Sequence, residues 1–71
     1  MNDIALSVNG EDVRLAPGST IADLVARLTE EADPKGVAVA VNRCVVPRSE
    51  WATTPARAGS LVEVVSAAAG G

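Results

Sequence analysis

The chain has 71 residues, of which 48% are hydrophobic, 21% are charged and only one is aromatic. This length forms one small domain with a single core, and such a core cannot spare the stability that a catalytic cavity costs. Six Lys and Arg residues against nine Asp and Glu residues give a net charge of −3, which argues against a nucleic-acid partner.

The set of reactive side chains is short, because His and Tyr are absent and Cys44 is the single cysteine. This excludes Ser/His/Asp and Cys/His nucleophiles, histidine-containing metal sites, iron–sulfur clusters and a disulfide framework. The first residues carry no targeting signal, and no apolar run approaches the ~20 residues that span a bilayer. We therefore expect a cytoplasmic protein with no bound metal or cofactor and no membrane partner.

The first predicted element is a β-hairpin around Asn9-Gly10. Apolar residues alternate with others on both sides of this pair, and a type I′ turn needs the positive φ that these two residue types tolerate. Pro17-Gly18 ends the second strand. The turn sets the register of the hairpin, with Val8 opposite Glu11, Leu6 opposite Val13 and Ile4 opposite Leu15.

A helix is predicted to follow the hairpin, because apolar residues recur at the spacing of a single helical stripe. Thr20 or Ser19 is the expected N-cap, and Asp23 adds a favourable negative charge in the first turn. The stripe consists of Ile21, Leu24, Val25 and Leu28.

The end of this helix is predicted from a proline. Asp33 precedes Pro34, and a residue before proline disfavours helical geometry, while Gly36 offers an exit from the helix. We expect the helix to stop near Glu31 or Ala32, after about three turns, and to pack on a sheet.

The middle of the chain predicts two more strands. Residues 37–41 alternate Val and Ala, which favours a central strand with both faces partly covered and close approach on the alanine side. A turn at Asn42-Arg43 leads to a short strand at residues 44–46. This strand ends at Pro47 or lies at an edge, because proline lacks the N–H that a ladder needs.

Residues 49–52 predict a helical turn in which Trp51, the only large ring, caps one end of the core. Residues 61–65 form the last predicted strand, with Val62 and Val64 on one face. Hairpin, helix and further strands define an α+β layer pair, although the pattern does not tell which strands are neighbours. No repeat or linker divides the chain, so we expect one domain at residues 1–66 and a flexible tail at residues 67–71.

The tail ends in Gly70-Gly71 after three alanines. A terminal carboxylate becomes reactive when ATP-dependent adenylation converts it to a mixed anhydride that a thiol, persulfide or amine attacks. The terminal carbon must reach the nucleotide through a narrow channel, to which two glycines present no Cβ. The tail thus predicts Gly71 as the reacting residue and Gly70 as the residue that lets it thread. On the tail alone, the alternative of a functionless frayed end stays open.

Cys44, Arg43 and Arg48 are weaker candidates. The chain has no histidine to activate Cys44, so we expect a small buried hydrophobe and not a functional thiol. The two arginines flank the short strand and offer charge to an acidic partner, although isolated surface arginines are usually only solvated. Branched aliphatic residues on the outer face of the sheet predict a docking patch, which the pattern does not locate.

The C-terminal third carries the most specific motifs: Val39-Ala40-Val41-Asn42, Val45-Val46-Pro47-Arg48-Ser49-Glu50-Trp51, Val62-Glu63-Val64-Val65 and Gly70-Gly71. Together with Asn9-Gly10 near the start, these motifs resemble the bacterial sulfur carrier proteins of thiamine biosynthesis, the ThiS-like branch of the ubiquitin-like family. The likeness runs the length of the chain. The segment Val-Pro-Arg-x-x-Trp is the discriminating motif, because a Gly-Gly terminus is shared by all ubiquitin-like carriers.

The resemblance implies a β-grasp fold, with a mixed four- to five-stranded sheet, parallel first and last strands in its middle, and one main helix across one face. It also implies that an ATP-using enzyme of the ubiquitin-activating type adenylates Gly71. The carboxylate then becomes a thiocarboxylate with sulfur relayed from a cysteine desulfurase, and it donates this sulfur to thiazole synthase. The protein is then a cosubstrate and not an enzyme.

Two alternatives stay open beside this reading. A sulfur carrier for molybdopterin or cysteine synthesis would share the fold and the tail. A ubiquitin-like interaction or modifier domain would use the tail for an isopeptide bond or not at all.

Overall fold

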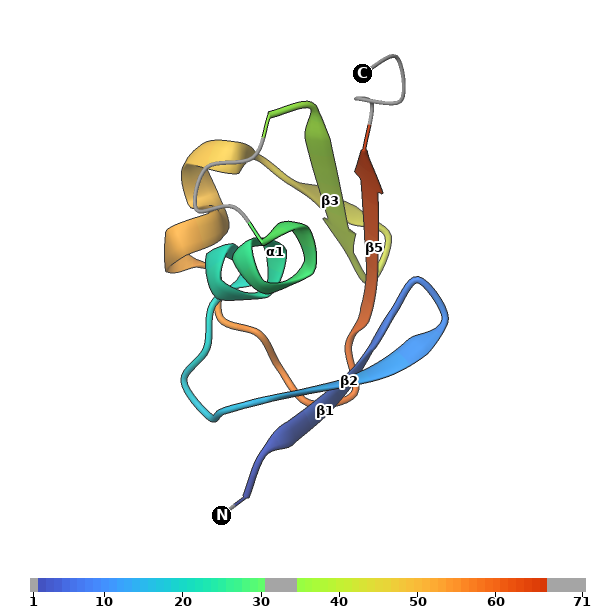
Figure 1. Cartoon of the computed structure of the whole chain (residues 1–71), viewed down its shortest axis with the longest axis vertical. Coiled ribbons are helices and arrows are strands. Elements are labelled where there is room, and N and C mark those ends of the chain that lie inside the picture. The colour runs from blue at the N-terminus through green and yellow to red at the C-terminus, as the bar shows by residue number, and fades with distance from the viewer. Residues whose placement is uncertain (1, 31–34, 67–71) are drawn as a thin grey trace.

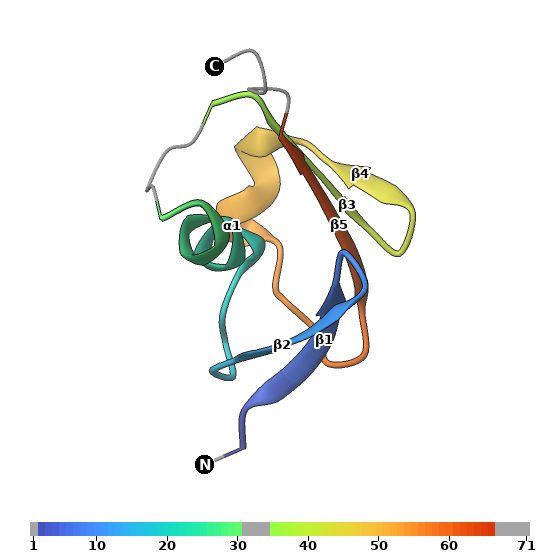
Figure 2. The same ribbon diagram turned by 45° about the vertical axis from the view of Figure 1, so that its right-hand side comes forward.

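The computed structural model describes residues 2–30 and 35–66. Its strands form a five-stranded mixed sheet in the order β2-β1-β5-β3-β4, and α1 and η1 lie on one side of it (Figures 1 and 2). The elements in chain order are β1 (Ile4–Val8), β2 (Glu11–Leu15), α1 (Ile21–Thr29), β3 (Val37–Val41), β4 (Cys44–Val46), the 3₁₀ helix η1 (Arg48–Thr53) and β5 (Leu61–Ser66).

The last strand, β5, occupies the centre of the sheet. It runs parallel to β1 and antiparallel to β3, and the two hairpins β1–β2 and β3–β4 form the flanks. The α+β class and the parallel pairing of first and last strands are therefore as expected.

The first hairpin confirms the predicted turn and register. Asn9 and Gly10 have φ values of 52° and 85°, the left-handed geometry of a type I′ turn. Ile4 faces Leu15, Leu6 faces Val13 and Val8 faces Glu11. The turn residues alone determine this register, because a two-residue loop leaves no freedom to slip.

Helix α1 begins at the predicted cap. The Thr20 hydroxyl accepts from the Asp23 N–H at 3.2 Å, and the Asp23 carboxylate accepts from the Thr20 N–H at 2.8 Å. Both bonds of a capping box are present, although Asp is shorter than the Glu or Gln that this motif prefers.

The predicted end of the helix is wrong by about one half-turn. The helix stops at Thr29, where the C-cap Glu30 adopts φ 59° in the left-handed region, and residues 31–34 lie outside the described part. Leu28, in the last turn of α1, is 41% exposed, so the buried stripe is shorter than predicted. A left-handed cap therefore ends α1 before the restriction at Asp33 applies.

Strand β3 lies inside the sheet between β5 and β4, as expected, but its alanine side is less covered than expected. Val39 is buried beneath the helical layer, whereas Ala38 is exposed and Ala40 is half-buried. Among the described residues, the helical layer lies on one side only (Figure 2). Alternation of Val and Ala thus marks an inner and an outer face, not two covered faces.

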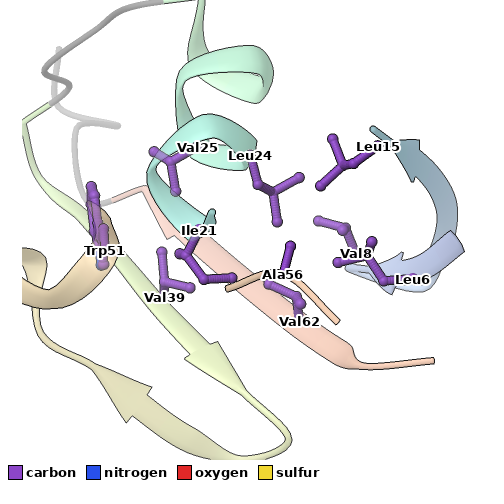
Figure 3. Close-up of a cluster of buried hydrophobic side chains, with 10 residues drawn as sticks. All are labelled: Leu6, Val8, Leu15, Ile21, Leu24, Val25, Val39, Trp51, Ala56 and Val62. Carbon is purple, nitrogen blue, oxygen red and sulfur yellow. The ribbon is translucent and has the colours of Figure 1, made fainter. Parts of the chain in front are cut away.

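The core fills the space between the sheet and α1 (Figure 3). Trp51 lies at one end of it, as predicted, with its indole N–H donating to the Val46 carbonyl at 2.9 Å. The guanidinium of Arg48 lies 5.4 Å from the centroid of the ring. The buried apolar residues are Leu6, Val8, Leu15, Ile21, Leu24, Val25, Val39, Trp51, Ala56 and Val62.

Candidate functional site

The predicted site residues Gly70 and Gly71 lie outside the described residues, as does the tail at 67–71. The structure instead describes the strand from which the tail departs. Ser66, the last residue of β5, stands opposite Val37 in the sheet, and at this end β5 lies beside β3, whereas β1 lies at the start of β5 (Figure 1).

On its β3 side, β5 is paired along its length, from Val62 opposite Val41 to Ser66 opposite Val37. At its start, the turn residue Asn42 adds two more bonds to Leu61. The Asn42 N–H donates to the Leu61 carbonyl at 2.7 Å, and the Asn42 Oδ1 accepts from the Leu61 N–H at 2.9 Å.

On its β1 side, β5 pairs with backbone only at Leu61 and Val62. The side chain of Asn9 takes over beyond them. Its Oδ1 accepts from the Val64 N–H at 2.9 Å, and its Nδ2 donates to the Val64 carbonyl at 3.1 Å. A side-chain amide carries the same donor and acceptor as a peptide group, so Asn9 extends the ladder by one residue.

The sequence reading missed this role of Asn9, which it used only as a turn residue. Asn9 and Asn42 both stand first in a two-residue turn with positive φ, and both direct an amide to β5. An Asn instead of a Gly at such a turn position indicates that a side-chain amide is available for hydrogen bonding. The sequence does not reveal its partner, because Val64 is 55 residues away from Asn9.

The register of the strands places exposed apolar residues on the outward side of the sheet, where the sequence predicts a docking patch. Leu61 and Val65 of β5 face away from the core and are 57% and 61% exposed, and Val45 of β4 is 76% exposed. Ala40 of β3 connects the two groups, because it stands opposite both Glu63 and Val45. We call the outward residues Ala38, Ala40, Val45, Leu61, Glu63 and Val65 the outer face.

A hollow of about 470 Å³ opens between the two hairpin turns, beside the start of β5. Arg43 from the β3–β4 turn and Glu63 from β5 contribute opposite charges to its wall. The other lining residues are Ser7, Asn9, Gly10, Leu61 and Val62.

The fold places the weaker candidates, Cys44, Arg43 and Arg48, in different surroundings. Cys44 is exposed at the end of the edge strand β4, so the expectation of a buried hydrophobe is wrong. A strand at the edge has a neighbour on one side only, which leaves the thiol open to solvent. Arg48 stacks on Trp51, whereas Arg43 lines the hollow.

Residues 2–30 and 35–66 contain no group of three acidic, Cys or His side chains placed to hold a metal ion.

The described part of the chain has no helix with the length and apolarity needed to cross a bilayer.

The central parallel pair of first and last strands, the flanking hairpins and the single crossing helix define a β-grasp protein of the ubiquitin-like class. The structure is similar to the crystal structure of the thiamine biosynthesis protein ThiS from Geobacter metallireducens. The TM-score is 0.75 and the sequence identity is 26%, and the match covers 89% of this chain and 93% of that one. Among curated proteins, no sequence match is found.

The ThiS family model matches residues 6–71. The chain therefore belongs to the ThiS family, whose members are sulfur carriers of thiamine biosynthesis and not enzymes. This confirms the resemblance inferred from the motifs of the C-terminal third.

Proposed function

We propose that Gly71 is the residue that carries sulfur. The observation that carries this proposal is the family match, which extends through the last residue of a chain ending in Gly70-Gly71. The Gly71 carboxylate attacks the α-phosphate of ATP on an activating enzyme of the ubiquitin-activating type, and pyrophosphate leaves. A cysteine persulfide formed by a cysteine desulfurase then displaces AMP and gives an acyl disulfide. A second thiol of the partner enzymes cleaves its S–S bond, which forms a protein disulfide and releases the thiocarboxylate that donates sulfur to thiazole synthase.

Gly70 has a separate, steric role in this scheme. A channel that admits the terminal carbon to the nucleotide must exclude water and wider chains, and a glycine passes where a Cβ collides. ATP is consumed by the partner, so the carrier needs no cofactor of its own. These reactions belong to the cytoplasm, where we place the protein.

The central position of β5 supports this proposal. Pairing with β3, the amide of Asn42 and the amide of Asn9 hold β5 from both sides. Covalent geometry limits the distance from Ser66 to Gly71 to about 18 Å. An enzyme that holds the terminal carbon must therefore bind close to the end of β5, where exposed Val65 offers apolar surface.

Mass spectrometry of the intact protein tests the proposal. Incubation with the cognate activating enzyme, ATP, a cysteine desulfurase, cysteine and a thiol reductant should replace one oxygen of Gly71 by sulfur. Thiazole synthase supplied with its sulfur-accepting substrate should restore the original mass. An unchanged mass after full incubation contradicts the proposal. Transfer to a molybdopterin or cysteine synthesis acceptor, but not to thiazole synthase, would favour the alternative carriers.

A further inference from the structure

Glu63 is the one charged residue of the outer face. Leu61 and Val65 flank it on the same strand, and Ala40 stands opposite it in the ladder. Val45 stands beyond Ala40 on the next strand. A carboxylate thus projects from among five apolar residues, which Ser7 of β1 borders opposite Leu61.

The described residues provide no counter-ion for this carboxylate. The Glu63 side chain makes no ion pair or hydrogen bond within residues 2–30 and 35–66. Arg43, which lines the same hollow, makes none there either. In the free protein, water solvates Glu63 at little cost.

A partner that covers Leu61, Val65 and Val45 removes that water. An isolated carboxylate in an apolar contact is strongly unfavourable unless a cation and hydrogen bonds replace the lost hydration. Within residues 2–30 and 35–66, Arg43 lines the same hollow but forms no ion pair with Glu63. We therefore expect an enzyme that binds this face to bring a positive charge to Glu63.

The hollow provides the space for that charge. Its volume of about 470 Å³ lies next to Glu63 and is lined in part by Leu61. A long basic side chain can lay its methylene stem on an apolar residue while its charged head reaches a carboxylate. Shape and charge therefore fit an inserted arginine or lysine.

We propose that Glu63 is the counter-ion for an arginine or lysine of the adenylating enzyme, and that this basic side chain enters the hollow between the two hairpin turns. The inference rests on the proposed function, because it assigns the partner that adenylates Gly71. The position of Glu63 in the sequence supports this choice of occupant, since it lies in the strand that immediately precedes residues 67–71 and therefore within reach of an enzyme that binds Gly71.

Substitution of Arg43 tests whether the partner places a basic or an acidic side chain in the hollow. A guanidinium in the wall repels an incoming basic side chain and attracts an acidic one. Removal of this charge by Arg43→Gln should thus lower the KM of the adenylation reaction, by about twofold at a solvated site. An acidic occupant predicts the opposite change.

The experiment is ATP–pyrophosphate exchange with the cognate adenylating enzyme, with KM and kcat measured for the carrier. Glu63→Gln should raise KM about tenfold and Glu63→Lys about a hundredfold or more, because a desolvated charge pair is lost or reversed. The kcat should stay at the wild-type value, since the tail is intact. Glu50→Gln, which removes the same charge from exposed η1, should leave KM unchanged.

Each outcome decides between the alternatives. Absence of exchange with the wild-type protein contradicts the proposed function itself. Normal exchange with a wild-type KM for Glu63→Lys overturns the role of Glu63 and leaves the carrier function standing. A raised KM for Arg43→Gln, with Glu63→Gln unaffected, means that the hollow takes an acid.

Two further controls address other occupants of the face. Loss of thiazole synthase binding by Glu63→Lys, at an unchanged exchange KM, would move the contact to that enzyme and overturn the assignment. Sedimentation of the wild type as a dimer that Glu63→Lys dissociates would assign the face to a second copy. Thermal melts of Glu63→Gln and Glu63→Lys should match the wild type, because the side chain is exposed and makes no contact that the fold needs.

Discussion

Val62 and Leu61 are neighbours in β5, yet Val62 is 2% exposed and Leu61 is 57% exposed. The inner residue packs in the core under α1 (Figure 3), and the outer residue faces a side of the sheet that no described helix covers (Figure 2). One strand thus stabilises the domain with alternate residues and presents a surface with the others. The difference teaches that adjacent residues of one strand can have separate roles, so substitutions at the two positions should separate stability from the recognition that we propose.

The largest effect on stability is expected from a substitution in the core, on the inner side of the sheet. Trp51→Ala removes the largest buried side chain and its hydrogen bond to Val46, at a cost of roughly 3–5 kcal/mol, which equals the whole stability expected of such a core. The variant should be unfolded by circular dichroism at room temperature. Trp51→Phe keeps a ring and should still show a cooperative melt. A wild-type melting curve for Trp51→Ala would contradict a structural role.

The next largest effect, on the rate of adenylation, is expected from changes in the tail, which belongs to neither side of the sheet. Deletion of Gly71 leaves the same carboxylate displaced by up to about 3.5 Å, and misplacement by ~1 Å can cost on the order of 10²-fold in rate. Pyrophosphate exchange should therefore collapse. Gly70→Val should also lose exchange, because a branched Cβ resists the narrow channel.

Both tail variants should keep the wild-type melting curve, which makes them the reverse of Trp51→Ala. Normal exchange and sulfur loading by the Gly71 deletion would show that the terminus has no chemical role.

Two matched substitutions compare the roles of the adjacent inner and outer residues of β5. Val62→Ala should lower the free energy of unfolding by about 2 kcal/mol, because it deletes two buried methyl groups. Leu61→Ala should change it by less than about 0.5 kcal/mol but raise the KM of adenylation. Denaturant titration and pyrophosphate exchange measure the two effects. Equal destabilisation by both variants would mean that the two sides are not separate.

The smallest effect is expected at the edge of the sheet. Cys44 is exposed, so Cys44→Ser should alter the free energy of unfolding by less than about 0.5 kcal/mol. It should also form the thiocarboxylate at the wild-type rate, as measured by intact mass over time. A variant that folds but no longer loads sulfur would make this thiol a relay in the reaction.

Local chemistry made much of this molecule predictable. Asn9-Gly10 predicted both the turn and the register of the first hairpin, and Thr20 predicted the start of α1. The predicted edge position of residues 44–46 was also correct. Each of these features depends on residues within a few positions of one another, where steric limits on φ and short hydrogen bonds decide the outcome.

Predictions failed where neighbours distant in sequence decide exposure. The covered alanine side of β3 and the buried Cys44 were inferred from residue type, but the single helical layer leaves one side of the sheet open and places Cys44 at an edge. The helix also ended early through the left-handed conformation of Glu30, which its residue type does not favour.

The sequence by itself determined the α+β class, the hairpin register, the start of the helix and the Gly-Gly terminus that carries the proposed chemistry. The local pattern did not tell which strands are neighbours, and the central position of β5 was implied only by the family resemblance. Only the tertiary structure decided that Asn9 completes the ladder of β5 to Val64 and that Glu63 lies among apolar residues beside a hollow. The physical reason is the distance along the chain. Pairing of β1 with β5 joins residues more than 50 positions apart, and no local propensity encodes which strand closes such a loop.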